Sequence, residues 1–162
     1  MMKKSKVLGA GMGALFALLL GICPASAEYN AGVIAVMRGD HDTAYKELLR
    51  PAELGVSDAQ FLLAALCDVL AGNGPCGEVE AFVWYSIALP RLPDTNVGRG
   101  SLARTRADAL RKNLTRTEAQ FSDNAIKNWS PSRHIDFSRL PKRITPPPVI
   151  APSADQGAET NQ

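Results

Sequence analysis

The chain has few of the residue types that usually carry catalytic chemistry. Among 162 residues it has only two histidines, His41 and His134, and they lie far apart in the sequence. It contains no nucleophile elbow, no phosphate-binding glycine loop and no zinc-ligand spacing. Glu78 and Glu80 are two positions apart, so a helix does not bring them to one face. We therefore expect no enzyme activity, no cofactor and no metal site.

One short motif leaves an alternative open. Asp40-His41-Asp42 invites an interpretation as a metal or acid–base site. Acidic residues are also favoured where a helix begins, because they satisfy its exposed amides and complement its dipole. We favour this structural interpretation.

No apolar run is long enough to cross a membrane. The stretch 7–22 is apolar but shorter than the roughly 20 residues that a spanning helix needs. Three lysines precede it and Ala25-Ser26-Ala27 follows it, which is typical of a secretory signal peptide over residues 1–27, cleaved after Ala27. The alternatives are an uncleaved anchor and lipidation at Cys23, against which the bulky Ile22 argues. We expect a periplasmic or secreted protein with no membrane anchor after cleavage.

The charge is small overall but unevenly distributed. The formal net charge of +2 becomes −1 if the three lysines of the leader are removed. Residues 28–90 have a net charge of −6, and residues 91–143 have a net charge of +7. This asymmetry could attract an anionic partner or favour head-to-tail self-association, although solvated helix faces explain it as well. No nucleic-acid-binding module is recognisable, so we do not expect a nucleic-acid partner.

Helical periodicity runs through the middle of the chain. We expect helices over about 29–37, from Asp40 to Gly55, from Ser57 to about 70, and over 77–89. Two more should follow the connection at 91–100. Ser57-x-x-Gln60 and Thr115-x-x-Glu118 read as capping boxes that begin the third and sixth helices. Residues 131–162 are rich in proline, and we expect this tail to be largely disordered, especially 145–162.

Small residues, glycines and two aromatics recur at positions typical of an α-helical repeat. Ala44 and Ala81 are 37 positions apart, as are Leu48 and Tyr85. The pattern resembles the Sel-one-like repeat, a relative of the tetratricopeptide repeat. The residues that carry the resemblance are Gly39, Ala44, Ala52, Gly55, Ala59, Gly72, Gly74, Ala81, Trp84, Tyr85 and Ala88.

The resemblance implies an all-α fold of stacked antiparallel helix pairs, an α-solenoid of two to three repeats over residues 28–130. It also implies an exported adaptor or scaffold that binds another protein. A groove for that partner would be lined by the first helix of each pair, with half of its candidate residues as plausibly core. The candidates are Asn30, Ile34, Gln60, Leu63, Cys67 and Asp68. The rival function is an envelope enzyme acting on β-lactams or peptidoglycan, as associated with cysteine-rich relatives whose dense cysteine pattern this chain lacks.

Two cysteines remain after the leader, Cys67 and Cys76. Their number is even, the expected compartment is oxidising, and closure of a helical hairpin would bring them together. We predict a Cys67–Cys76 disulfide. Free buried thiols and a reactive thiol are the alternatives, but no histidine lies near either cysteine in the sequence to lower the pKa of a thiol.

Overall fold

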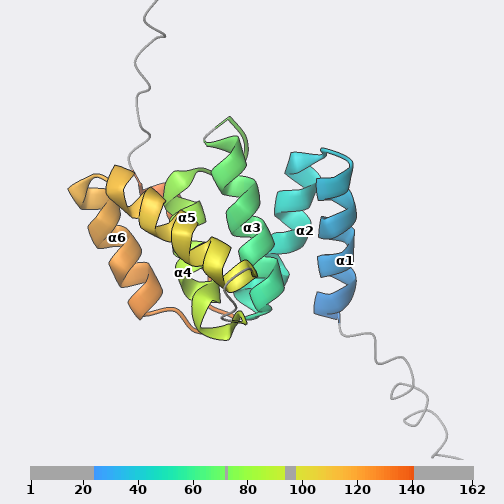
Figure 1. Cartoon of the computed structure of the whole chain (residues 1–162). Helices are drawn as coiled ribbons and strands as arrows, with labels where there is room; N and C mark the ends of the chain where they lie inside the picture. Colours follow the sequence, from blue (N-terminus) through green and yellow to red (C-terminus); the bar gives the residue numbers. More distant parts are fainter. Residues whose placement is uncertain (1–23, 72, 94–97, 141–162) are drawn as a thin grey trace, which may run out of the picture.

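The computed structural model describes residues 24–71, 73–93 and 98–140, and this part of the chain is all-α (Figure 1). None of its helices is long and apolar enough to cross a membrane. The helices are α1 (Pro24–Met37), α2 (His41–Glu53), α3 (Ser57–Leu70), α4 (Glu78–Ala88), α5 (Arg99–Asn113) and α6 (Arg116–Lys127), with short 3-10 turns at Leu89–Arg91 and Phe137–Arg139.

The helices pack mainly on their neighbours in the sequence. α1 lies on α2, α2 on α3, α3 on α4, and α4 on α5, whereas α6 lies chiefly against α4. In Figure 1, α1 stands at one edge of the molecule and α6 at the opposite edge. The prediction of an all-α domain of packed helix pairs is therefore confirmed.

Local signals set most of the helix ends. The Asp40 carboxylate accepts a hydrogen bond from the Thr43 amide at 3.1 Å and caps α2. Gly39 and Gly55 have φ of +71° and +93°, a region that side chains disfavour, so they end their helices at little cost. The predicted capping box of α6 is confirmed, because the Thr115 amide donates to Glu118 Oε2 at 2.8 Å and the Glu118 amide donates to the Thr115 hydroxyl at 3.3 Å.

The second predicted capping box is wrong. Ser57 is the first residue of α3, Val56 precedes it as the cap, and no side chain caps this helix. Gln60 Nε2 instead donates to the Ala52 carbonyl at 2.9 Å across the turn between α2 and α3. The Gln60 side chain is therefore oriented by the Ala52 carbonyl near the end of α2 and not by the first turn of its own helix.

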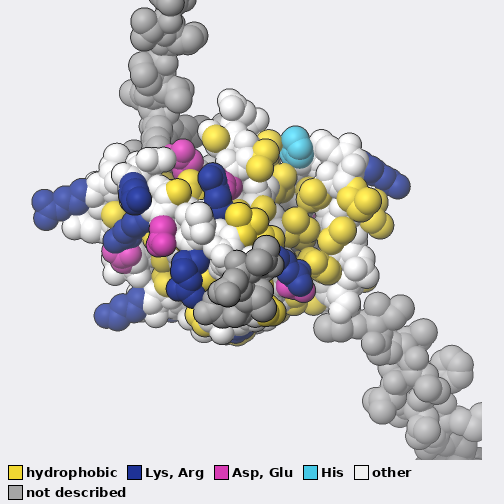
Figure 2. All heavy atoms as spheres, viewed as in Figure 1, with side chains coloured by type: hydrophobic (Ala, Val, Ile, Leu, Met, Phe, Trp, Pro, Cys, Tyr) yellow, Lys and Arg dark blue, Asp and Glu magenta, His cyan; other side chains and the backbone are white. Residues whose placement is uncertain are grey.

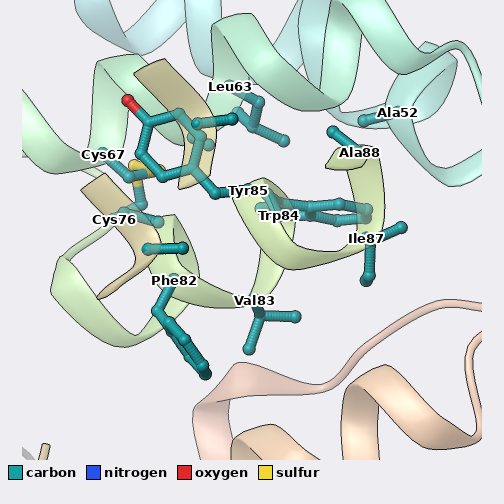
Figure 3. Close-up of a cluster of buried hydrophobic side chains, with 14 of the residues drawn as sticks. Ala52, Leu63, Cys67, Cys76, Phe82, Val83, Trp84, Tyr85, Ile87 and Ala88 are labelled. Atoms are coloured by element: carbon teal, nitrogen blue, oxygen red, sulfur yellow. A yellow bond between two sulfur atoms is a disulfide. The ribbon is translucent and has the colours of Figure 1, made fainter. Parts of the chain in front are cut away.

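The core lies mainly between α3 and α4 (Figure 3). Trp84 and Tyr85 of α4 are buried there with Leu63 of α3 and with several alanines. The close-up shows Trp84 on the side of Ala88 and Ile87, while Tyr85 lies on the side of Cys67 and Leu63. Small side chains let these helices approach closely, and the large aromatics fill the remaining space.

Residues that are 37 positions apart in the sequence are buried at equivalent places on α2, α4 and α6. Ala44 of α2 and Ala81 of α4 are fully buried, and so are Leu48 and, almost completely, Tyr85. The same step reaches Glu118 and Ser122 of α6, which are also buried. The second helices of the three pairs thus turn matching positions inward.

Other small residues of the repeat pattern lie at positions where two helices, or a turn and a helix, pack closely. Ala52, Ala59 and Ala88 are fully buried. A Cβ atom at Gly74 would come within 2.6 Å of Leu70 Cδ1, so glycine lets the turn before α4 lie against α3. Gly72 lies outside the described residues.

The packed domain continues beyond residue 130. We call residues 129–140 the strap, because this segment returns from α6 to the end of α2. The Ser132 amide donates to the Glu53 carbonyl at 2.7 Å, and Ile135 is buried in the core. Phe137 lies 5.8 Å from Phe121 between ring centroids. Part of the predicted tail therefore packs on the domain, through Ser132, Ile135 and Phe137, whereas the predicted disorder at 145–162 lies outside the described residues.

The predicted boundary between the leader and the mature chain lies within a helix. α1 begins at Pro24, so the predicted cleavage site after Ala27 lies within its first turn. The leader itself, residues 1–23, lies outside the described residues.

Candidate functional site

The Cys67–Cys76 disulfide is present and closes the hairpin of α3 and α4. Cys67 is fully buried near the end of α3, Cys76 precedes α4, and their Cα atoms are 5.1 Å apart. The carboxylate of Glu80 lies within 4.8 Å of both sulfur atoms. These three residues could ligate a metal only if both cysteines were thiolates. In the disulfide form they have a structural role.

Glu80 is a buried carboxylate of α4. The Tyr45 hydroxyl donates to its Oε1 at 2.6 Å, joining α2 to α4. Burial raises the pKa of Glu80 to about 6, although the hydrogen bond from Tyr45 and the nearby Trp84 indole act in the opposite direction. Burial and the neighbouring carboxylate likewise raise the pKa of Tyr45. A raised pKa is common at active sites, but Glu80 is only 6% exposed, so a substrate cannot reach it in this conformation.

The residues predicted to line a partner groove do not form a common exposed surface. Gln60 and Leu63 are fully buried, and so is Cys67, so the prediction that they line a groove is wrong. They belong to the face of α3 that α2 and α4 cover. Asn30 and Ile34 of α1 are exposed, as expected for a surface.

Asp68 is occupied by an ion pair within the chain. Its carboxylate accepts two hydrogen bonds of 2.6 Å from Arg106 of α5, from Nε and from Nη2. Arg99 of α5 pairs with Asp58 of α3 at 2.8 Å. Part of the charge asymmetry between the two halves is therefore neutralised by these ion pairs between α3 and α5.

Exposed large apolar side chains gather on the first helices of the pairs. They are Ile34 and Met37 on α1, Val69 on α3 and Leu102 on α5, and Leu54 at the end of α2 is the remaining one among the described residues. Figure 2 shows hydrophobic side chains concentrated over α1–α3, whereas positively charged ones lie mainly over α5 and α6.

The sequence did not predict that Val69, Met37 and Leu102 would be exposed. Val69 looked like core because α3 is apolar around most of its circumference, yet its side chain is 82% exposed. Met37 and Leu102 carry no motif. For Met37 the available signal was the absence of any charged residue between Glu28 and Arg38, since an outer helix face normally carries some charge.

A second surface feature lies between α6 and the strap. It is a depression of about 420 Å³ whose apolar wall is formed by Phe121, Ala125 and Trp129, with Asn124, Asn128 and Arg133 among its polar lining residues. The Arg91 guanidinium stacks over the Trp129 ring at 5.0 Å from its centroid. His134 Nδ1 lies 2.5 Å from Glu53 Oε1 and helps hold the strap to α2.

A scan of protein-family models, a search of curated proteins and a search of solved structures each gave no match to this chain. The resemblance to Sel-one-like repeats therefore depends on the residue pattern and on the pairing of helices.

Proposed function

We propose that this chain is an exported, non-catalytic module that binds another protein through the first helices of its Sel-one-like helix pairs. The observation that carries the proposal is the placement of the exposed large apolar side chains. Val69 is 82% exposed and Leu102 is 50% exposed, and they project from consecutive first helices, α3 and α5. Arg106 of α5 forms an ion pair with Asp68 of α3, the residue next to Val69.

Scattered apolar residues are normal on protein surfaces, whereas a group of them beside fixed polar residues marks an interaction site. The ion pairs Arg99–Asp58 and Arg106–Asp68 connect the same two helices; Asp68 directly precedes Val69, and Leu102 lies between Arg99 and Arg106 in the sequence. We call Val69, Leu102 and these two ion pairs the α3–α5 surface. Its exposed apolar side chains and its charged groups suit a partner that has a small hydrophobic patch of its own.

Export supports the same proposal. The disulfide is consistent with an oxidising compartment outside the cytoplasm. The leader predicted over residues 1–27 would direct the chain there.

Site-specific photo-crosslinking in the producing cells tests the proposal. A photoreactive residue at position 69 or 102 should give an adduct with one and the same second protein. A probe at Lys46, an exposed residue of the second helix α2, is the matched control and should give no such adduct. Val69→Asp should abolish the adduct formed at position 102 without unfolding the domain, since the side chain is exposed.

Equal labelling from all three positions, or none at 69 and 102, would contradict binding at the α3–α5 surface. The rival function is tested by incubating the purified protein with a β-lactam and with peptidoglycan. Hydrolysis of either would replace the proposed function by an enzymatic one. No described residue arrangement favours that rival.

A further inference from the structure

The α3–α4 hairpin brings three potential metal ligands together in the core. Cys67 Sγ, Cys76 Sγ and a carboxylate oxygen of Glu80 all lie within 4.8 Å of one another. Cys67 is fully buried, Cys76 is 7% exposed and Glu80 is 6% exposed. Figure 3 shows the two cysteines meeting between the ribbons of α3 and α4. The cysteines are nine positions apart, which is not a zinc-ligand spacing, so the packing of α3 on α4 and not a local motif assembles this group.

Glu80 is a buried carboxylate that has no ion pair. Its Oε1 accepts a hydrogen bond from the Tyr45 hydroxyl at 2.6 Å. Within residues 24–71, 73–93 and 98–140, no basic side chain forms a salt bridge with it. Buried carboxylates are normally paired with a cation or bound to a metal ion, because an isolated buried charge is costly. The hydrogen bond from Tyr45 also orients the carboxylate, as hydrogen bonds commonly do for carboxylates that bind a metal.

We propose that the chain binds one zinc ion through Cys67, Cys76 and Glu80 when its disulfide is reduced. Thiolates select zinc and similar thiophilic ions over calcium and magnesium, and a carboxylate is also a common zinc ligand. Three protein ligands leave the fourth position of a tetrahedral site for water. The ion then closes the α3–α4 hairpin in place of the disulfide.

Reduction has to precede metal binding. A dithiol reductant supplies two electrons and two protons, so that the Cys67–Cys76 bond breaks to give two thiols and the reductant becomes a disulfide. Zn²⁺ then replaces the two thiol protons, which pass to water. The two Sγ atoms have to lie about 3.8 Å apart, as Zn–S bonds of about 2.3 Å in a tetrahedral site require. Rotation about χ1 of the two cysteines can provide this separation while their Cα atoms stay 5.1 Å apart.

This metal site is separate from the proposed function. It lies in the core, whereas the proposed partner contacts the exposed Val69 and Leu102. Loss of metal binding would leave the crosslinks from positions 69 and 102 intact, and loss of those crosslinks would leave metal binding intact.

The test compares the reduced protein with the oxidised protein. The protein is isolated from the producing cells, reduced with excess dithiothreitol in urea, and refolded under nitrogen without the reductant. A count of two free thiols in each chain verifies reduction, and circular dichroism verifies the fold. Both forms are titrated with Co²⁺, whose tetrahedral thiolate complexes are coloured, and then with Zn²⁺.

The reduced wild-type chain should bind one Co²⁺ ion. It should then show the visible bands of a tetrahedral site and the near-ultraviolet band of a thiolate–cobalt bond, and Zn²⁺ should displace the cobalt. The oxidised chain should show none of these bands. One equivalent of Zn²⁺ should also raise the thermal midpoint of the reduced chain, because an ion that binds the folded state stabilises it.

Glu80→Gln is the decisive variant. Glutamine removes the charged ligand but can still accept the hydrogen bond from Tyr45, so the fold should persist. The reduced variant should bind Zn²⁺ at least about tenfold more weakly, since even residues behind the ligands affect metal affinity by this factor. Cys76→Ser should lose the tetrahedral cobalt spectrum. Glu47→Gln, the same change at a partly exposed residue of α2, is the matched control and should bind like the wild type.

Three results would overturn the proposal. The first is a folded, fully reduced wild-type chain that binds neither metal ion. The second is a reduced Glu80→Gln variant that binds Zn²⁺ as tightly as the wild type, because the two cysteines alone would then hold the ion. The third is an oxidised chain that binds equally well, because the ion would then lie elsewhere. If the reduced chain unfolds, one equivalent of Zn²⁺ should restore its helical circular dichroism, and failure to do so would count equally against the site.

Discussion

Replacing the buried Glu80 with glutamine should stabilise the protein at neutral pH. The carboxyl has a raised pKa of about 6 in the folded state, compared with an ordinary value of 4.5, and burial is the main cause. The folded state therefore binds more protons than the unfolded state between these two values. The contribution of Glu80 to stability should be greatest below about pH 4.5 and fall as the pH rises through about 6.

The size of the stability change follows from the difference between the folded and the ordinary pKa of Glu80. One pKa unit corresponds to about 1.4 kcal/mol, so ionising Glu80 in the folded protein costs about 2 kcal/mol at pH 7. A glutamine at position 80 carries no charge and can still accept the hydrogen bond from the Tyr45 hydroxyl. We expect Glu80→Gln to raise the free energy of unfolding by up to about 2 kcal/mol at pH 7 and to have little effect at about pH 4.

Urea denaturation followed by circular dichroism measures this difference at each pH. The quantity to compare is the difference between the wild-type chain and the variant, because other groups titrate in the same range and cancel in it. Glu47→Gln, which makes the same change at a partly exposed site on α2, is the control and should show no such trend.

A second variant tests the contact with α2. Tyr45→Phe removes the hydroxyl that donates to Glu80, so it should lower stability more at pH 7 than at pH 4. In the Glu80→Gln background its effect should lose this pH dependence. The reasoning is refuted if Glu80→Gln has the same effect at both pH values, or if it destabilises the protein at pH 7.

Three further predictions concern the disulfide and the two ends of the chain. Cys67→Ala with Cys76→Ala should lower the free energy of unfolding by less than about 3 kcal/mol, since the closed loop is short, and two alkylatable thiols in the native, never-reduced protein would contradict the bond. Truncation after residue 144 should leave the thermal midpoint nearly unchanged, whereas truncation after 130 should lower it by several degrees because Ile135 and the contact of the strap with Glu53 are lost. Amino-terminal sequencing of the exported protein should begin at Glu28, and a lipidated Cys23 would contradict this prediction.

The sequence by itself determined the features that depend on neighbouring residues. Gly39 and Gly55 end their helices because they tolerate positive φ, and Asp40 and Thr115 begin theirs because their side chains reach amides three residues later. The disulfide followed from a short hairpin that leaves two cysteines little room to lie apart. These are local effects, so local patterns predict them.

Only the tertiary structure decided which helix faces are covered. Periodicity places Val69 and Leu63 on an apolar helix, but it does not show that α2 and α4 cover one and leave the other in solvent. The burial of Glu80 depends on Tyr45, which is 35 residues away, and the docking of the strap depends on Glu53, which is 81 residues from His134. Burial depends on residues distant in the sequence, and a single sequence does not reveal how distant segments pack.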